Sequence, residues 1–164
     1  MKEDGVTLIE LIVVVSVIAV LVFALGFTFQ RWMGGYKIES QVKELHVDLM
    51  NARARAMQRN RIHFVVANAG DYQVYEDTDE DGAIPLPIDA GDTRILRPDP
   101  KPLTYPVEST SWTGTITMDT RGLVSPNNTT IRFAIGSNTP DYDCLVLSAT
   151  RINIGKWDGT CNIK

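Results

Sequence analysis

GVTLIELIVVVSVIAVLVFALGFTF, residues 5–29, is a long apolar run that contains one ionisable side chain, Glu10. The stretch from Val6 to Phe29 is about 24 residues long, enough for a helix to cross a bilayer core of about 30 Å. An acid inside a spanning helix costs about 2.5 to 3.5 kcal/mol on insertion scales unless it finds a partner. The run therefore predicts a membrane-spanning helix over residues 6–29 and leaves the partner of Glu10 to be explained.

Two simpler interpretations of this run compete with that prediction. A cleavable secretory signal would have a shorter apolar core behind a basic start, followed by a cleavage site of small residues, and this pattern is not clear here. A plain single-pass anchor with Glu10 near the headgroups explains the hydrophobicity but not the position of the acid.

The following residues, 30–60, predict an amphipathic continuation of the same helix. Gly34-Gly35 is predicted to bend or end the helix locally, since glycine lowers helix stability by about 1 kcal/mol relative to alanine. Beyond it, apolar side chains recur at steps of three or four residues and predict a buried stripe. Its members are Ile38, Val42, Leu45, Leu49, Ala52 and Ala56.

Four arginines, Arg53, Arg55, Arg59 and Arg61, follow at the end of this helix. We interpret them as a solvated face that complements the negative end of the helix dipole. Contact with acidic neighbours or with DNA is the alternative.

Residues 61–164 predict a domain of antiparallel strands. A hairpin is expected over 61–68 and 71–76, from alternating apolar residues on either side of Ala69-Gly70. Further strands are expected at 93–96, 115–118, 130–135, 144–148 and 151–154. The fold class is therefore α+β, with one long N-terminal helix packed on an antiparallel sheet.

Charge and cysteine content restrict the function classes. A net charge of −4 and a pI near 5.1 argue against binding nucleic acid through overall charge. Cys144 and Cys161 form no CxxC motif and have no histidine at zinc-site spacing, so a disulfide is favoured over two free thiols or a metal site.

An acidic turn matches the first half of a calcium-binding loop. In EDTDEDG, residues 76–82, the ligands would be Asp77, Asp79 and Asp81 with the carbonyl of Ala83. The twelfth position is isoleucine, so Asp89 or Asp92 would have to replace the usual glutamate. The alternative is an acidic, solvated turn that binds no ion.

Signals of enzymatic chemistry are missing from the sequence. It has no GxSxG, Walker A, Rossmann or HExxH pattern, and His46 and His63 lack metal-ligand spacing. We therefore expect a protein that is not an enzyme, with two structural histidines.

GVTLIE, residues 5–10, followed by LIVVV, residues 11–15, resembles the class III signal of type IV pilins and type II secretion pseudopilins. The resemblance implies that a prepilin peptidase cuts between Gly5 and Val6 on the cytoplasmic side and methylates the new N-terminus. It also implies a partner for Glu10, because in this family the acid meets the N-terminal amine of a neighbouring subunit in a filament. Such a pairing offsets the burial of both ions only when the two are in register.

The later segments resemble the GspH/FimT group of minor pilins and pseudopilins. They are MDTRGL (118–123), IRF (131–133), CLVLS (144–148), RI (151–152) and GTC (159–161). The resemblance implies a pilin fold with a leader at 1–5, a membrane-spanning half of the spine helix at 6–29, an amphipathic half at 30–60 and a β-rich domain at 61–164. It also implies that the two cysteines pair.

The expected function is that of a minor pilin or pseudopilin in a type IV pilus or a type II secretion pseudopilus. Its expected partners are other pilins, the prepilin peptidase, an inner-membrane assembly platform and lipid. The expected location is the bacterial inner membrane, with the N-terminus cytoplasmic and the domain periplasmic, and later the filament. One alternative is a DNA-binding subunit using Arg151, Lys156 and Lys164, and the other is an anchored domain that never polymerises.

Overall fold

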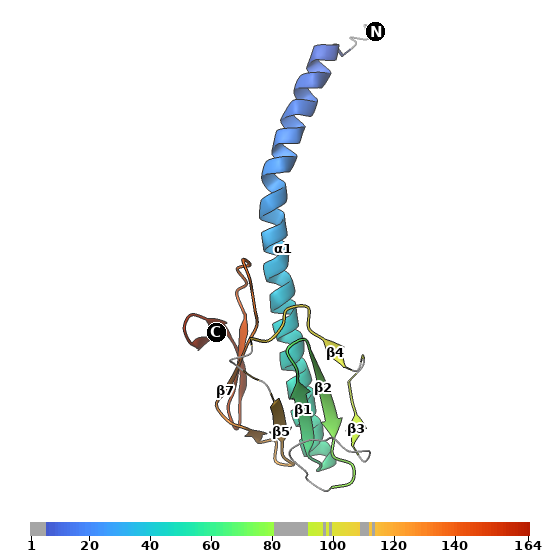
Figure 1. Cartoon of the computed structure of the whole chain (residues 1–164), viewed down its shortest axis with the longest axis vertical. Helices are drawn as coiled ribbons and strands as arrows, with labels where there is room; N and C mark the ends of the chain where they lie inside the picture. The colour runs from blue at the N-terminus through green and yellow to red at the C-terminus, as the bar shows by residue number, and fades with distance from the viewer. Residues whose placement is uncertain (1–5, 81–91, 97, 99, 109–111, 113) are drawn as a thin grey trace.

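A single long helix, α1 (Leu8–Arg59), dominates the molecule in the computed structural model (Figure 1). The structure describes residues 6–80, 92–96, 98, 100–108, 112 and 114–164, without the side chains of 25–31. Thr7 caps the N-terminus of α1, where its Oγ1 accepts a hydrogen bond from the backbone N–H of Glu10 at 3.3 Å. Asn60 ends the helix in the left-handed conformation with φ of 53°.

The helix does not end at Gly34-Gly35, where the sequence predicted a bend or an end. Instead, both glycines lie against the loop at residues 138–140. A Cβ on Gly34 would lie 2.0 Å from the Asn138 Oδ1, and one on Gly35 would lie 3.4 Å from the Thr139 carbonyl oxygen. The glycine pair therefore allows the domain to approach the helix closely.

The strands form two antiparallel sheets. The first has the order β3-β2-β1-β5-β6, with β4 also paired to β2. Its strands are β1 (His63–Ala67), β2 (Asp71–Glu76), β3 (Thr93–Arg94), β4 (Lys101–Pro102), β5 (Gly114–Met118) and β6 (Val124–Ser125). The second has the order β10-β9-β8-β7, with β7 (Thr129–Arg132), β8 (Cys144–Leu147), β9 (Ile152–Trp157) and β10 (Cys161–Ile163). An isolated bridge between Val107 and Phe133 lies outside these strands.

Both sheets pack against the C-terminal half of α1, which contacts β1 and β5 of one sheet and β8 and β9 of the other. All six members of the predicted stripe are buried, with at most 2% of each residue exposed. They share one core with side chains from both sheets, such as Val65, Ile116, Leu145 and Leu147. The predicted α+β architecture of one helix on antiparallel strands is confirmed, with two sheets in place of one.

Side-chain hydrogen bonds also fasten the helix to distant segments. Gln41 donates from Nε2 to the carbonyl oxygen of Tyr105 at 2.7 Å and accepts from its backbone N–H at 3.0 Å. The His46 Nε2 lies 3.1 Å from the carbonyl oxygen of Ile152, and the Arg53 Nη1 donates to that of Thr150 at 2.7 Å. His46 thus has a structural contact between α1 and the last hairpins.

Candidate functional site

The N-terminal half of α1 extends beyond the domain (Figure 1), and its exposed side chains are mostly apolar. Every side chain from residue 6 to residue 24 is exposed, with large apolar residues ranging from 51% exposed at Val14 to 78% at Leu8. Among the described side chains, the buried hydrophobic core begins only at Ile38. A surface of this extent and composition marks an interaction site, since soluble monomers rarely expose large contiguous apolar patches.

A search of the described part of the chain finds no helix with both the length and the apolar character to cross a membrane.

Glu10 lies in the first turn of α1, beside the capping residue Thr7. Negative side chains are favoured there because the helix dipole places partial positive charge at the N-terminus. Thr7-Leu8-Ile9-Glu10 also has the spacing of a capping box, a sequence signal for this start of the helix that was not among the predictions above. Gly5 lies outside the described residues and Val6 is 74% exposed, so leader cleavage and the pairing of Glu10 with an amine stay predictions.

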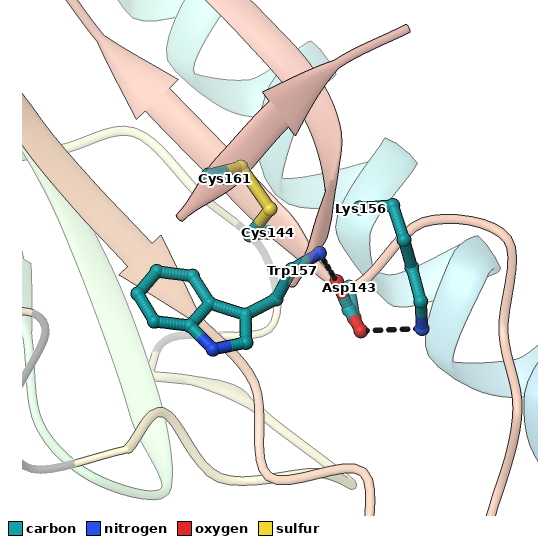
Figure 2. The surroundings of a disulfide bond; sticks show 5 residues. All are labelled: Asp143, Cys144, Lys156, Trp157 and Cys161. Atoms are coloured by element: carbon teal, nitrogen blue, oxygen red, sulfur yellow. Dashed lines mark hydrogen bonds and ion pairs between the residues drawn. A yellow bond between two sulfur atoms is a disulfide. The ribbon is translucent and has the colours of Figure 1, made fainter. Parts of the chain in front are cut away.

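The second sheet contains a disulfide and a buried carboxylate (Figure 2). Cys144 of β8 and Cys161 of β10 are bonded, with their Cα atoms 6.0 Å apart, which is the pairing expected from the sequence. Asp143, 1% exposed, accepts hydrogen bonds from the Lys156 Nζ at 2.7 Å and from the backbone N–H of Trp157 at 2.6 Å. These contacts fix the start of β8 to the end of β9.

Two of the three bases considered for DNA, Lys156 and Lys164, lie near acidic side chains of the domain. Lys156 neutralises Asp143, and the Lys164 Nζ lies 4.0 Å from an oxygen of Asp141 and 5.7 Å from the centre of the Tyr142 ring. Arg151 is exposed. DNA binding by this set stays a prediction, and its charges are partly balanced within the domain.

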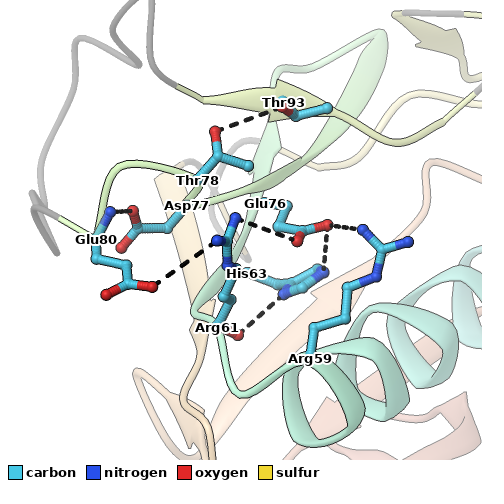
Figure 3. Close-up of polar contacts among 8 residues, drawn as sticks. All are labelled: Arg59, Arg61, His63, Glu76, Asp77, Thr78, Glu80 and Thr93. Atoms are coloured by element: carbon cyan, nitrogen blue, oxygen red, sulfur yellow. Dashed lines mark hydrogen bonds and ion pairs between the residues drawn. The ribbon is translucent and has the colours of Figure 1, made fainter.

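A second polar cluster lies at the C-terminal end of α1 (Figure 3). Glu76, 3% exposed, accepts a hydrogen bond from the Arg59 Nη1 at 2.6 Å, and the Arg61 Nη1 lies 3.9 Å from its other oxygen. Arg61 also lies 3.9 Å from Glu80. Arg59 therefore contacts Glu76, and Arg61 contacts Glu76 of β2 and Glu80 of the turn that follows it, which is the contact with acidic neighbours considered as the alternative. The Arg59 side chain stays 56% exposed and lies in the last turn of α1, as a solvated face at the negative end of the helix dipole requires.

His63 lies inside this cluster and is fully buried. Its Nδ1 is 3.1 Å from the carbonyl oxygen of Arg61, and its Nε2 is 3.9 Å from Glu76. Burial lowers the pKa of His63 below its usual value, and the Arg61 carbonyl and Glu76 only partly oppose this effect. The neutral ring donates from Nδ1 to the carbonyl, which gives His63 a structural role.

The acidic turn brings three carboxylates together. One oxygen from each of Asp77, Asp79 and Asp92 lies within 4.8 Å of the others. Asp77 is 2% exposed, and its Oδ1 accepts a hydrogen bond from the backbone N–H of Glu80 at 2.7 Å. Two predicted ligands, Asp81 and Ala83, lie outside the described residues. Calcium takes six to eight oxygen ligands, of which this cluster offers three, so calcium binding stays a prediction.

A family model described as type II transport protein GspH matches residues 41–150, about two thirds of the chain. The matched segment begins within the C-terminal half of α1 and covers most of the domain. No curated protein and no solved structure matches the chain.

Proposed function

The chain belongs to the GspH family of type II transport proteins, and from that premise we propose that it is a minor pseudopilin, a structural subunit of a type II secretion pseudopilus. The family is structural rather than enzymatic. A type IV pilus subunit is the alternative assembly of the same kind. The observation that carries the proposal is the bare apolar half of α1, joined to a domain that has its own core.

The apolar half of α1 would lie in the bacterial inner membrane before assembly and among other spine helices afterwards. Both surroundings remove its exposed apolar side chains from water, which stabilises by about 25 cal/mol for each Å² buried. The disulfide supports a periplasmic domain, because such bonds persist in oxidising compartments. The N-terminus would then be cytoplasmic, where a prepilin peptidase acts.

Cleavage between Gly5 and Val6, with methylation of the new amine, would free the partner that Glu10 needs. The carboxylate of Glu10 is on an exposed turn at the very start of α1, where an amine from an adjacent subunit can approach. The cost of burying the Glu10 carboxylate and the amine of the adjacent subunit is offset only when the two groups face each other directly. This pair would therefore set the axial position of each subunit in the filament.

Two measurements test the proposal. The intact mass of the protein purified from its own membrane is expected to show the loss of residues 1–5 and the gain of one methyl group. Glu10→Ala is expected to abolish incorporation into the filament while the protein still inserts into the membrane, because the acid acts in assembly.

Ser16→Ala is the matched control, since Ser16 is an exposed polar residue of the same apolar segment whose Oγ bonds its own helix. This control is expected to assemble normally. An intact leader in functional protein, or normal function of Glu10→Ala, would instead support an anchored domain that does not polymerise.

A further inference from the structure

A pocket of about 340 Å³ lies between α1 and the segment that contains β4. Sites for small molecules typically have volumes of about 300 to 1,000 Å³. The lining residues that matter here are Lys37, Ser40, Glu44, Tyr72, Leu103 and Thr104. The pocket is therefore large enough for a small group and offers it both polar and apolar walls.

The pocket lining contains one cationic and one anionic side chain. Lys37 and Glu44 are about two turns apart on α1, so they lie on one face of the helix and are separated by about 10 Å along it. The Lys101 Nζ lies 2.8 Å from the Oε1 of Glu44, whereas Lys37 has no acidic partner among the described residues. Because the two charges of the lining balance, a ligand that carries both signs fits better than a simple anion.

Lys37 lies close to the point where α1 leaves the predicted membrane span. It follows residue 29 by about 12 Å of helix, and the headgroup layer is about 5 to 7 Å deep on each side of a bilayer. A lysine side chain is long enough to reach back toward this layer. Trp32 and Tyr36, which are exposed and stack with ring centroids 6.3 Å apart, are of the types enriched at membrane–water interfaces. Lys37 therefore marks the end of the pocket that faces the membrane.

We propose that this pocket binds the phosphoethanolamine headgroup of a phospholipid in the periplasmic leaflet, with the phosphate at Lys37 and the ammonium at Glu44. The inference rests on the proposed function, because it needs the apolar half of α1 in the membrane. The order of charges agrees with this ligand. The phosphate is attached to the lipid glycerol, nearer the bilayer, and the ammonium is at the free end of the headgroup.

The other lining residues suit the same group. Ser40 and Thr104 carry hydroxyl groups that can donate to phosphate oxygens. Tyr72 and Leu103 offer apolar surface to the carbon atoms between the phosphate and the ammonium. A bound headgroup would hold the domain against the bilayer surface, in one rotation about α1, until the subunit leaves the membrane for assembly.

Native mass spectrometry of the full-length protein, released from detergent micelles with added lipid, tests the binding. We expect one retained phosphatidylethanolamine per protein and about tenfold weaker retention of phosphatidylglycerol, which lacks the ammonium. Lys37→Ala is expected to weaken retention about tenfold. Lys43→Ala is the matched control, because Lys43 is an exposed lysine of the same helix that lies 3.7 Å from Glu39 and outside the pocket lining. Equal losses in these two variants, or equal retention of the two lipids by the unsubstituted protein, would overturn the proposal.

Two further variants test the charge and the space of the pocket separately. Glu44→Gln is expected to remove the preference for phosphatidylethanolamine over phosphatidylglycerol. Ser40→Trp places an indole in the pocket and is expected to abolish retention of both lipids, whereas Gln58→Trp, at another exposed position of α1, is expected to leave retention unchanged. All three positions are exposed, so the melting temperature of the domain is expected to stay the same. Lipid retention by Ser40→Trp, or an unchanged preference in Glu44→Gln, would contradict the proposal.

Soluble phosphoethanolamine identifies the source of the headgroup. We expect it not to displace the lipid at equal concentration, because it lacks the acyl chains that keep the headgroup beside α1. Displacement would show that the pocket takes a soluble compound and would overturn the assignment to the membrane.

Leader processing and the Glu10→Ala variant separate failure of this inference from failure of the proposed function. If no lipid is retained while the leader is removed and Glu10→Ala blocks assembly, only the pocket assignment is wrong. If the leader stays and Glu10→Ala keeps full function, the proposed function is wrong and the inference falls with it.

Discussion

The side chain of His63 is fully buried. Burial opposes protonation of its ring, and so do the nearby positive charges of Arg55 and Arg59. Glu76 and the carbonyl of Arg61 favour the proton but do not outweigh these effects. The unfolded chain therefore binds a proton more readily than the folded domain. Stability is fully present above the unfolded pKa of about 6.5 and is lost as the pH falls toward the lower folded pKa.

Replacing His63 removes this proton linkage. His63→Gln is expected to flatten the decrease in melting temperature between pH 7.5 and about 5.5, relative to the unsubstituted protein. Scanning calorimetry at a series of pH values measures the slope. An unchanged slope in the variant would show that His63 does not control stability in this range.

Gly155 is required by close packing in the second sheet. A Cβ there would lie 2.5 Å from the carbonyl oxygen of Asn162 and 2.8 Å from the Cys161 Sγ, so β10 would have to move. Gly155→Ala is expected to destabilise the domain by about 1 to 3 kcal/mol. Gly70→Ala is the control, because no atom lies within 4 Å of its added Cβ. Equal denaturation midpoints for the two variants would contradict this reasoning.

At the scale of elements, the sequence predicted the parts that have a strong hydrophobic period. The stripe of α1 and the hairpin of β1 and β2 follow directly from spacing, and the strands β3, β5, β8 and β9 lie within or close to the expected ranges. The short strands β4, β6 and β10 were missed. Each has two or three residues, too few to show a period, and each is defined by the neighbour with which it pairs.

The polar clusters were harder to predict than the strands. Nothing in the sequence distinguishes Glu76 or Asp143 from an exposed acid, because their burial depends on arginine and lysine partners that reach them from other elements. The calcium-loop pattern did point to Asp77 and Asp79, and it named Asp92 as a substitute ligand. A local motif can be predicted from sequence, whereas an ion pair formed by the fold cannot.

The acidic turn after β2 gives a prediction at this scale. Calcium is expected to raise the melting temperature of the domain, with a dissociation constant on the order of 0.1 to 1 mM, as in extracellular sites. Asp79→Asn is expected to abolish this shift with little effect on the calcium-free protein, since Asp79 is exposed. Calorimetry with and without about 10 mM calcium decides the matter. If calcium does not change the melting temperature of the unsubstituted protein, the prediction is wrong and the segment is a solvated acidic turn that binds no ion.

At the scale of the whole molecule, the domain and the apolar half of α1 are energetically separable. The described core contains no residue before Ile38. A chain that begins at Trp32 is therefore expected to fold as a monomer, with the disulfide formed and the melting temperature of the full-length protein in detergent. Size-exclusion chromatography and circular dichroism test this expectation. A lower melting temperature would show that the removed segment supports the domain.

The hydrogen bonds of His46 to Ile152 and of Arg53 to Thr150 join residues 106 and 97 positions apart. Bringing such remote segments together costs loop-closure entropy and slows folding relative to local contacts. The helix is also the first part to be synthesised, while β9, which covers it, is among the last. The apolar stripe of α1 therefore stays exposed to water until nearly the whole chain has left the ribosome. Translation interrupted near residue 150 would release a helix whose apolar stripe is still partly exposed to water. Such a chain is expected to be bound by chaperones and degraded by proteases.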